Sequence, residues 1–117
     1  MDDPAALLAD LRRHRAAVAE RVQEFELLAR GLAEARSDAD TDDEHDPEGS
    51  TVSWDRAVTA ATAQGAREHL AQIDAAIARV ESGWDGSCAG CGEQIPAERL
   101  TVRPHTDCCV SCADLRT

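Results

Sequence analysis

Four cysteines near the end of the 117-residue chain stand in two pairs, Cys88 with Cys91 and Cys109 with Cys112. Two residues separate the cysteines of each pair, so both thiolates can reach one ion from a single tight turn. The seventeen residues between the pairs allow the two turns to meet around a tetrahedral centre, as zinc requires of four sulfur ligands. Gly92 follows the first pair and suits a backbone position with positive φ. We predict one structural zinc ion, because four protein ligands leave no coordination position for a substrate.

A fifth cysteine, Cys108, is adjacent to Cys109 and leaves two interpretations open. In the first, Cys109 binds the ion because it restores the two-residue spacing, and Cys108 is a spare thiol. In the second, Cys108 is an alternate ligand or a redox-sensitive neighbour. A disulfide framework is not expected, because the number of cysteines is odd and the chain shows no secretory signal. No apolar run is long enough to span a membrane, so we expect a cytoplasmic protein.

The formal net charge of −11 disfavours direct binding to nucleic acid, which needs a basic surface to displace counterions. Most of this charge is local, because residues 38–48 contain seven carboxylates and no arginine. They are Asp38, Asp40, Asp42, Asp43, Glu44, Asp46 and Glu48. Such a run is often only a solvated loop. Like charges oppose folding, however, and a few neutral residues would join two helices equally well, so we interpret the run as a contact site.

Two long helices are predicted on either side of the acidic run, over residues 5–36 and 51–82. Each carries one apolar stripe with the three- and four-residue steps of a coiled coil. The stripe residues are Leu7, Leu11, Val18, Val22, Phe25, Leu28 and Leu32 in the first helix and Ala66, Leu70, Ile73, Ile77, Val80 and Trp84 in the second. Neither helix can bury its stripe alone. We therefore predict an all-α fold, with an antiparallel coiled-coil helical hairpin followed by a small C-terminal C4 zinc finger.

The chain is predicted to divide after residue 82. Residues 1–82 would form the helical hairpin, and residues 83–117 the zinc-finger module. Gly83 lies at the boundary, where a glycine is well suited to end the second helix as its C-cap.

The turn of the hairpin is predicted over residues 37–50, which places the carboxylates at its tip. Pro47 and Gly49 are expected to break the helix there, and Ser50 or Thr51 to cap the next one. Trp54 lies just inside the second helix and has two interpretations. It is either a contact residue for a partner or a staple that packs the end of the hairpin.

The residues around the cysteine pairs form a distinctive motif. Residues 84–100 read WDGSCAGCGEQIPAERL, and an Arg-Pro dipeptide at 103–104 precedes the second pair. This sequence closely resembles the DksA/TraR zinc-finger family. The resemblance implies that Ile95 and Leu100 form the small core of the finger, and that Arg99 lies at its surface or caps a backbone group.

The resemblance also implies a function, because members of this family bind bacterial RNA polymerase and are not enzymes. Their hairpin enters the secondary channel, where acidic tip residues alter initiation complexes near the catalytic centre, often in the stringent response. The residues implied here are Asp42, Asp43, Asp46 and Glu48, with Trp54 as a further partner contact. Asp43 and Asp46 match the two acids of the best-known tip motif, whereas Glu48 replaces its alanine. We expect a monomer that contacts neither DNA nor a membrane directly.

Other functions are compatible with the same residues. Tip carboxylates could recruit a second Mg²⁺ and stimulate transcript cleavage, as Gre-type factors do. A zinc-stabilised adaptor or a redox sensor based on Cys108 is a further alternative. Some family members bind ppGpp through basic residues, but Gly65, Gln72 and Ala113 occupy the comparable positions here, so sensing of this nucleotide is not expected.

Overall fold

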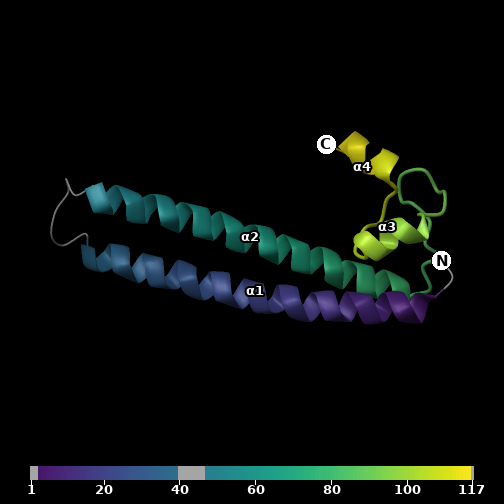
Figure 1. Cartoon of the computed structure of the whole chain (residues 1–117), viewed down its shortest axis with the longest axis horizontal. Helices are drawn as coiled ribbons and strands as arrows, with labels where there is room; N and C mark the ends of the chain where they lie inside the picture. Colours follow the sequence, from purple (N-terminus) through teal and green to yellow (C-terminus); the bar gives the residue numbers. More distant parts are fainter. Residues whose placement is uncertain (1–2, 40–46, 117) are drawn as a thin grey trace. The chain divides into compact units, whose positions relative to one another are not determined.

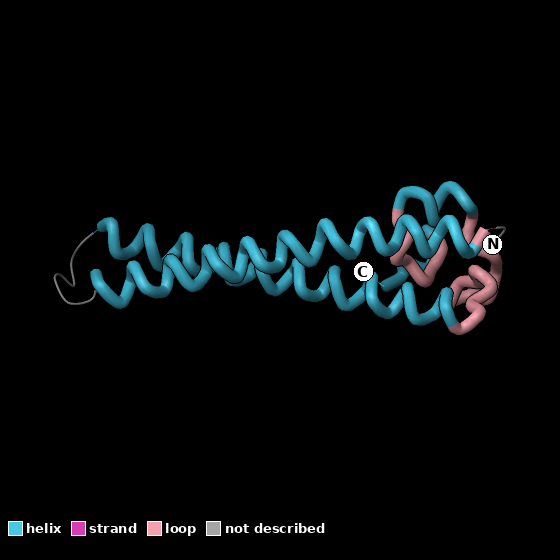
Figure 2. The backbone as a smooth tube through the Cα atoms, turned by 90° about the horizontal axis from the view of Figure 1, so that it is seen from below, coloured by secondary structure: helices cyan, strands magenta, loops and turns pink. Residues whose placement is uncertain are grey.

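The computed structural model describes residues 3–39 and 47–116, and side chains at 32–39, 47–50, 52 and 116 are not described. The described residues form four helices, and no strand beyond one isolated antiparallel bridge between Ser87 and Gln94 (Figures 1 and 2). The helices are α1 (Pro4–Ala39), α2 (Pro47–Glu81), α3 (Ala97–Val102) and α4 (Val110–Arg116). The predicted all-α hairpin with a cysteine cluster after it is confirmed. Among the described residues no helix is long and apolar enough to cross a membrane.

The chain divides into two compact units, and the first contains Met1–Ala17 and Leu70–Thr117. In this unit the start of α1 runs antiparallel to the end of α2, with Leu11 and Ile73 fully buried between them. Leu7, Ala76 and Val80 complete this core. Exposed ion pairs from Arg12 to Glu81 and from Arg15 to Asp74 cross between the helices at 3.4 and 2.6 Å. Such pairs contribute little each, so the buried apolar side chains provide most of the stability.

The second unit, Val18–His69, holds the remaining parts of both long helices. Its described core is smaller, with Val18 and Val22 of α1 and Ala63 of α2 buried. Arg67 pairs with Glu26 across the helices at 3.1 Å. Because alanine buries little apolar area, this unit gains less from packing than the leucine- and isoleucine-containing core of the first.

The first helix begins at an N-cap. Asp3 accepts a hydrogen bond from the N–H of Ala6 at 3.0 Å, three residues into the helix. Pro4 takes the first helical position, where its missing N–H costs nothing. The negative charge of Asp3 also complements the positive end of the helix dipole.

The second helix ends at Glu81, and Gly83 forms its C-terminal cap, as predicted. The N–H of Trp84 donates to the carbonyl of Arg79 and the N–H of Gly83 to that of Val80, at 3.0 and 3.1 Å. Gly83 has a φ of 94°, and this bonding pattern is a Schellman motif. The Arg79 guanidinium lies 5.2 Å from the centroid of the Trp84 ring, so the two residues that flank the cap also contact each other. The cap fixes where the chain leaves α2.

The boundaries of the turn differ from the prediction. The first helix continues to Ala39 and the second starts at Pro47, so the predicted tip at 37–50 is helical at both ends. Pro47 does not break the helix because it occupies the first turn, where proline is tolerated. Ser50 and Thr51 lie inside α2 and cannot be its caps.

The predicted apolar stripes are largely correct, but Leu28 is an exception. Its side chain is 56% exposed, and it does not widen the buried face of α1. Ala76 is buried although it was not assigned to the stripe of α2. Ala76 lies three residues after Ile73 and four before Val80, so it shares their face of the helix.

We predict that Leu11→Ala or Ile73→Ala lowers the free energy of unfolding of the zinc-loaded protein by about 2–5 kcal/mol, because each truncation leaves a cavity in a fully buried site. Urea denaturation followed by circular dichroism measures this change. The matched control is Leu27→Ala, at a position 62% exposed in the same helix as Leu11. Equal effects of Leu11→Ala and Leu27→Ala would contradict the assigned core.

Candidate metal centre

The first cysteine pair is held by a tight turn. The N–H of Gly92 donates to the carbonyl of Cys88 at 2.9 Å, and the N–H of Cys88 donates to the carbonyl of Glu93 at 2.7 Å. Gly92 has a φ of 79°, which is positive as predicted. A residue with a side chain would be strained in this backbone conformation. These bonds fold the chain back so that Cys91 lies near Cys88.

The second pair lies at the start of α4. Cys109 immediately precedes this helix and Cys112 falls in its first turn. The N–H of Ala113 donates to the carbonyl of Cys109 at 3.0 Å. The N–H of Ala89 donates to the carbonyl of Asp107 at 2.8 Å and joins the two cysteine segments directly.

The four predicted ligands come together in one cluster. The Sγ atoms of Cys88, Cys91, Cys109 and Cys112 all lie within 4.8 Å of one another, and those of Cys91 and Cys109 are 3.9 Å apart. A zinc–sulfur bond of about 2.3 Å gives a tetrahedron with edges of about 3.8 Å, so the cluster fits this ion closely. The predicted single structural zinc is confirmed as the cofactor of the finger.

Backbone N–H groups prepare this cluster to hold negative charge. Cys88 Sγ accepts hydrogen bonds from the N–H groups of Cys109 and Gly90, each at 3.3 Å. The N–H of Cys109, followed by those of Cys91 and Gly90, lowers the pKa of the Cys88 thiol to about 6. Hydrogen bonding of the Cys112 thiol to the sulfurs of Cys109 and then Cys88 favours its protonated form and raises its pKa to about 12, with burial as a further cause. Without a cation the cluster therefore cannot hold four thiolates at neutral pH.

Gly90 is required by the close approach of the two pairs. A Cβ at this position would lie 2.8 Å from the Sγ of Cys112. The sequence alone did not single out Gly90, because its neighbour in space is 22 positions away along the chain.

Cys108 lies outside the four-sulfur cluster. Its side chain is buried in the core of the finger with Ile95, Leu100 and the side chain of Cys88. This confirms the small core that the resemblance implied. The backbone N–H of Cys108 donates to the hydroxyl of Thr106 at 3.3 Å, and that hydroxyl donates to the Cys108 carbonyl at 3.1 Å. The structure thus favours Cys109 as the ligand and Cys108 as a small apolar core residue.

Arg79 attaches the finger to the end of α2, and Arg99 makes a hydrogen bond within the finger. Arg79 donates from Nη2 to the carbonyl of His105 at 3.3 Å, while Arg99 donates from Nε to the carbonyl of Cys108 at 3.2 Å. The Arg99 bond matches its predicted capping role. The sequence analysis did not identify Arg79 as a contact of the finger, because an arginine near the end of a helix is common. Its place next to Val80, a residue of the apolar stripe, was the one indication that it lies near the packed face.

The predicted tip residues are described only in part. Asp42, Asp43 and Asp46 lie outside the described residues. Glu48 belongs to the first turn of α2, but its side chain is not described. The side chain of Trp54 is 70% exposed, so it does not staple the hairpin. Its role as a partner contact stays a prediction, as do the roles of the acids.

Comparison with known proteins finds similarity at three levels: a protein family, a curated protein and a solved structure. The family model of the prokaryotic dksA/traR C4-type zinc finger matches residues 83–117. An uncharacterized protein from Aquifex aeolicus (strain VF5) is 44% identical over 45 residues, which are 38% of this chain and 31% of that protein. The aligned part thus spans about a third of that relative's length. The structure of transcription factor DksA2 from Pseudomonas aeruginosa matches with a TM-score of 0.76 at 22% identity, over 99% of this chain and 85% of that one. At this identity the likeness shows the fold.

We predict that Cys109→Ser lowers the zinc content of the purified protein well below one ion per chain, because it removes one sulfur ligand. Cys108→Ser is the matched control, and it should keep one zinc ion while losing some stability through its buried hydroxyl. Metal analysis after gel filtration distinguishes the two variants. The reverse result would make Cys108 the ligand.

We also predict that zinc affinity rises with pH between about pH 6 and pH 8. In the zinc-free protein the raised pKa keeps the Cys112 thiol protonated in this range, so that zinc binding must release its proton. The lowered pKa of Cys88 means that competition from protons at that thiol becomes strong only below about pH 6. Titration calorimetry in buffers of different ionisation enthalpy measures the released protons. An affinity that is constant over this range would contradict the coupling.

Proposed function

We propose that this chain is a transcription regulator that binds bacterial RNA polymerase, because its residues 83–117 match the family model of the prokaryotic dksA/traR C4-type zinc finger. In this proposal the hairpin enters the secondary channel of the enzyme. The acidic segment between α1 and α2 then modulates initiation complexes near the catalytic centre, and the chain itself catalyses no reaction.

The observation that carries the proposal is the combination of this finger with a long helical hairpin. The fold matches that of transcription factor DksA2 over nearly the whole chain. A shared fold does not by itself imply a shared function, so the family-specific finger is the stronger support. Neither feature alone would favour a polymerase partner as strongly.

The charge distribution is consistent with a protein partner rather than DNA. Seven carboxylates fall within residues 38–48, and the whole chain carries a formal net charge of −11. Such a chain is repelled by the phosphate backbone. Carboxylates can instead interact with bound magnesium or with basic residues inside an enzyme.

The fully coordinated zinc supports a non-enzymatic role. All four ligands of the ion are cysteine sulfurs, and such a site has no open position for water or substrate. The metal therefore supplies structure, and the proposed activity must come from side chains elsewhere. A pull-down with purified core RNA polymerase tests the partner directly, and failure to bind would overturn the proposal.

We predict that Asp43→Asn combined with Asp46→Asn abolishes the effect on transcription and leaves polymerase binding within about threefold, because the tip is proposed to act on the catalytic centre more than to anchor the complex. Promoter-complex lifetimes and a binding titration measure the two properties separately. Asp55→Asn is the control, since it removes a carboxylate from the exposed surface of α2 outside the acidic segment.

The outcomes separate the proposed role from its alternatives. Loss of binding in the double variant would make the tip an affinity element. Shortened transcripts from stalled polymerase complexes would indicate stimulated cleavage and would contradict a purely regulatory role.

A further inference from the structure

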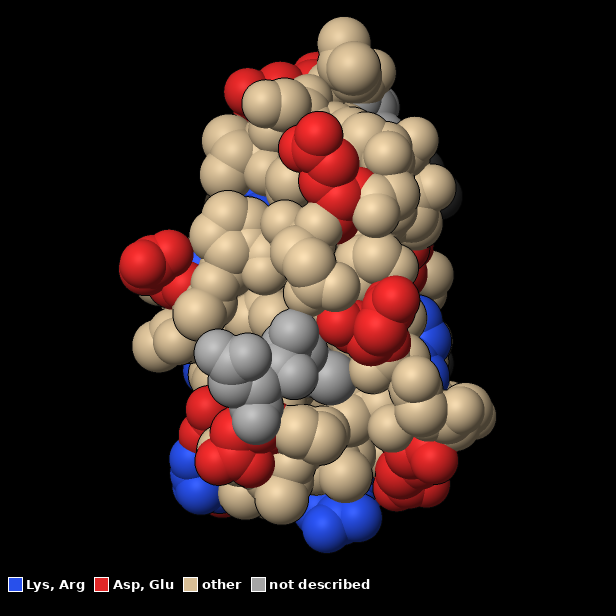
Figure 3. All heavy atoms as spheres, turned by 90° about the vertical axis from the view of Figure 1, so that its right-hand side faces the viewer, with Lys and Arg blue, Asp and Glu red and all other residues tan. Residues whose placement is uncertain are grey.

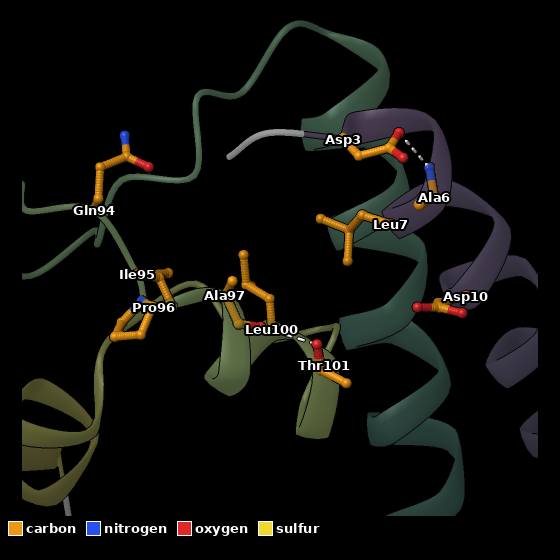
Figure 4. Close-up of a pocket in the computed structure, with 10 residues that line it drawn as sticks. All are labelled: Asp3, Ala6, Leu7, Asp10, Gln94, Ile95, Pro96, Ala97, Leu100 and Thr101. Carbon is orange, nitrogen blue, oxygen red and sulfur yellow. Dashed lines mark hydrogen bonds between the residues drawn. The ribbon is translucent and has the colours of Figure 1, made fainter.

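A groove of about 580 Å³ lies within the first unit, between the start of α1 and the finger (Figure 4). One wall is formed by the first two turns of α1, and the other by the segment that leads into α3 together with α3 itself. Its lining residues are Asp3, Ala6, Leu7, Asp10, Gln94, Ile95, Pro96, Ala97, Leu100 and Thr101. This volume falls in the range of sites that accept a few side chains or a small ligand.

The floor of the groove is apolar and firmly held. Leu7, Ile95 and Leu100 are buried residues of the two cores that meet here. In Figure 4 the Leu7 side chain points across the groove toward α3, where Ala97 and Leu100 lie opposite. Because zinc and helix packing hold both walls, the groove exists before any ligand arrives, which lowers the entropic cost of binding.

Among the described residues that line the groove, the charged ones are all acidic. Asp3 and Asp10 line it on the α1 side, and none of its ten lining residues is basic. Figure 3 views this end of the molecule and shows separate carboxylates around uncharged atoms, with arginines mainly at the margin. The groove therefore combines an apolar floor with an acidic edge, where Asp3 forms no ion pair among the described residues and Asp10 forms an exposed ion pair with Arg13.

Both carboxylates retain capacity to bind a cation. Asp3 uses Oδ1 to accept the N–H of Ala6, and Asp10 uses Oδ1 to accept a hydrogen bond from Arg13. Each carboxylate has a second oxygen with its own lone pairs. A guanidinium or ammonium at this edge would gain a charge-assisted hydrogen bond without displacing the helix cap.

We propose that this groove binds a segment of a protein partner in which an apolar side chain stands beside an arginine or lysine. The apolar side chain would contact Leu7 and Leu100, and the cation would pair with Asp3 or Asp10. A second copy of this chain is a poorer occupant, because its net charge of −11 opposes association at an acidic edge. This proposal does not depend on whether the chain binds RNA polymerase.

A short labelled peptide of alternating leucine and arginine is a suitable probe, used with the full zinc-loaded protein and followed by fluorescence anisotropy. Peptides of alternating leucine and glutamate, and of alternating serine and arginine, test the two halves of the proposed recognition. We expect the leucine–arginine peptide to bind at least about tenfold more tightly than either, because each comparison peptide lacks one of the two contacts.

Two variants locate the binding. Asp3→Asn with Asp10→Asn should weaken binding about fivefold, and the asparagine at position 3 still caps α1. Ala97→Trp should fill the groove and weaken binding more than tenfold, since Ala97 is an exposed lining residue. Zinc content and helical signal verify that each variant is folded.

Glu20→Gln with Glu24→Gln is the matched control, because it removes two exposed carboxylates from the second unit. The amide resonances of Leu7, Ala97 and Leu100 should shift on peptide addition. Equal weakening by the control pair, or shifts confined to other residues, would show non-specific attraction and overturn the proposal. Shifts of the same amides with protein concentration alone would identify a second copy as the occupant and would also overturn it.

Discussion

The fold of the C-terminal finger depends on the interaction between one cation and four thiolates. Among the described residues of its buried core, Ile95 and Leu100 are the only sizeable apolar side chains beside two cysteines, and Trp84 packs against them partly buried. Burying two such side chains contributes about 3–6 kcal/mol. Ordering the backbone costs about 1–2 kcal/mol for every residue, so a segment of this length cannot fold on apolar burial alone. Zinc supplies the missing stability, and the cysteine spacing is therefore the strongest constraint in the chain.

The metal site also carries a net negative charge, which the surrounding groups must stabilise. Four thiolates and one divalent cation leave a net charge of −2, in a chain that is already acidic. The N–H groups directed at Cys88 offset part of this charge, and Arg79 and Arg99 donate to carbonyls of the same module. Because Arg79 belongs to α2, its hydrogen bond to His105 holds the finger against the end of this helix.

Sequence reasoning predicted the helices and the metal ligands because both rest on local spacing. Leu11 and Ile73 are fully buried where the stripes placed them, and Gly83 caps α2 with the expected positive φ. The error at Pro47 arose because proline both ends helices and starts them, and only the backbone distinguishes the two. The groove could not be predicted, because its walls are about ninety residues apart in the chain and no sequence pattern links the two.

Because four cysteines saturate the zinc site, the proposed recognition must use other side chains, and the chain offers two different kinds of acidic surface. The acidic segment at 38–48 has seven carboxylates and no large apolar side chain, so its attraction for a partner is almost purely electrostatic. The proposed groove combines two carboxylates with a floor of leucine and isoleucine. Exposed charges are screened within about 10 Å at 0.1 M salt, whereas apolar contact is not weakened by salt. Added salt should therefore weaken interactions of the segment more than those of the groove, and this difference separates their contributions even when one partner contacts both.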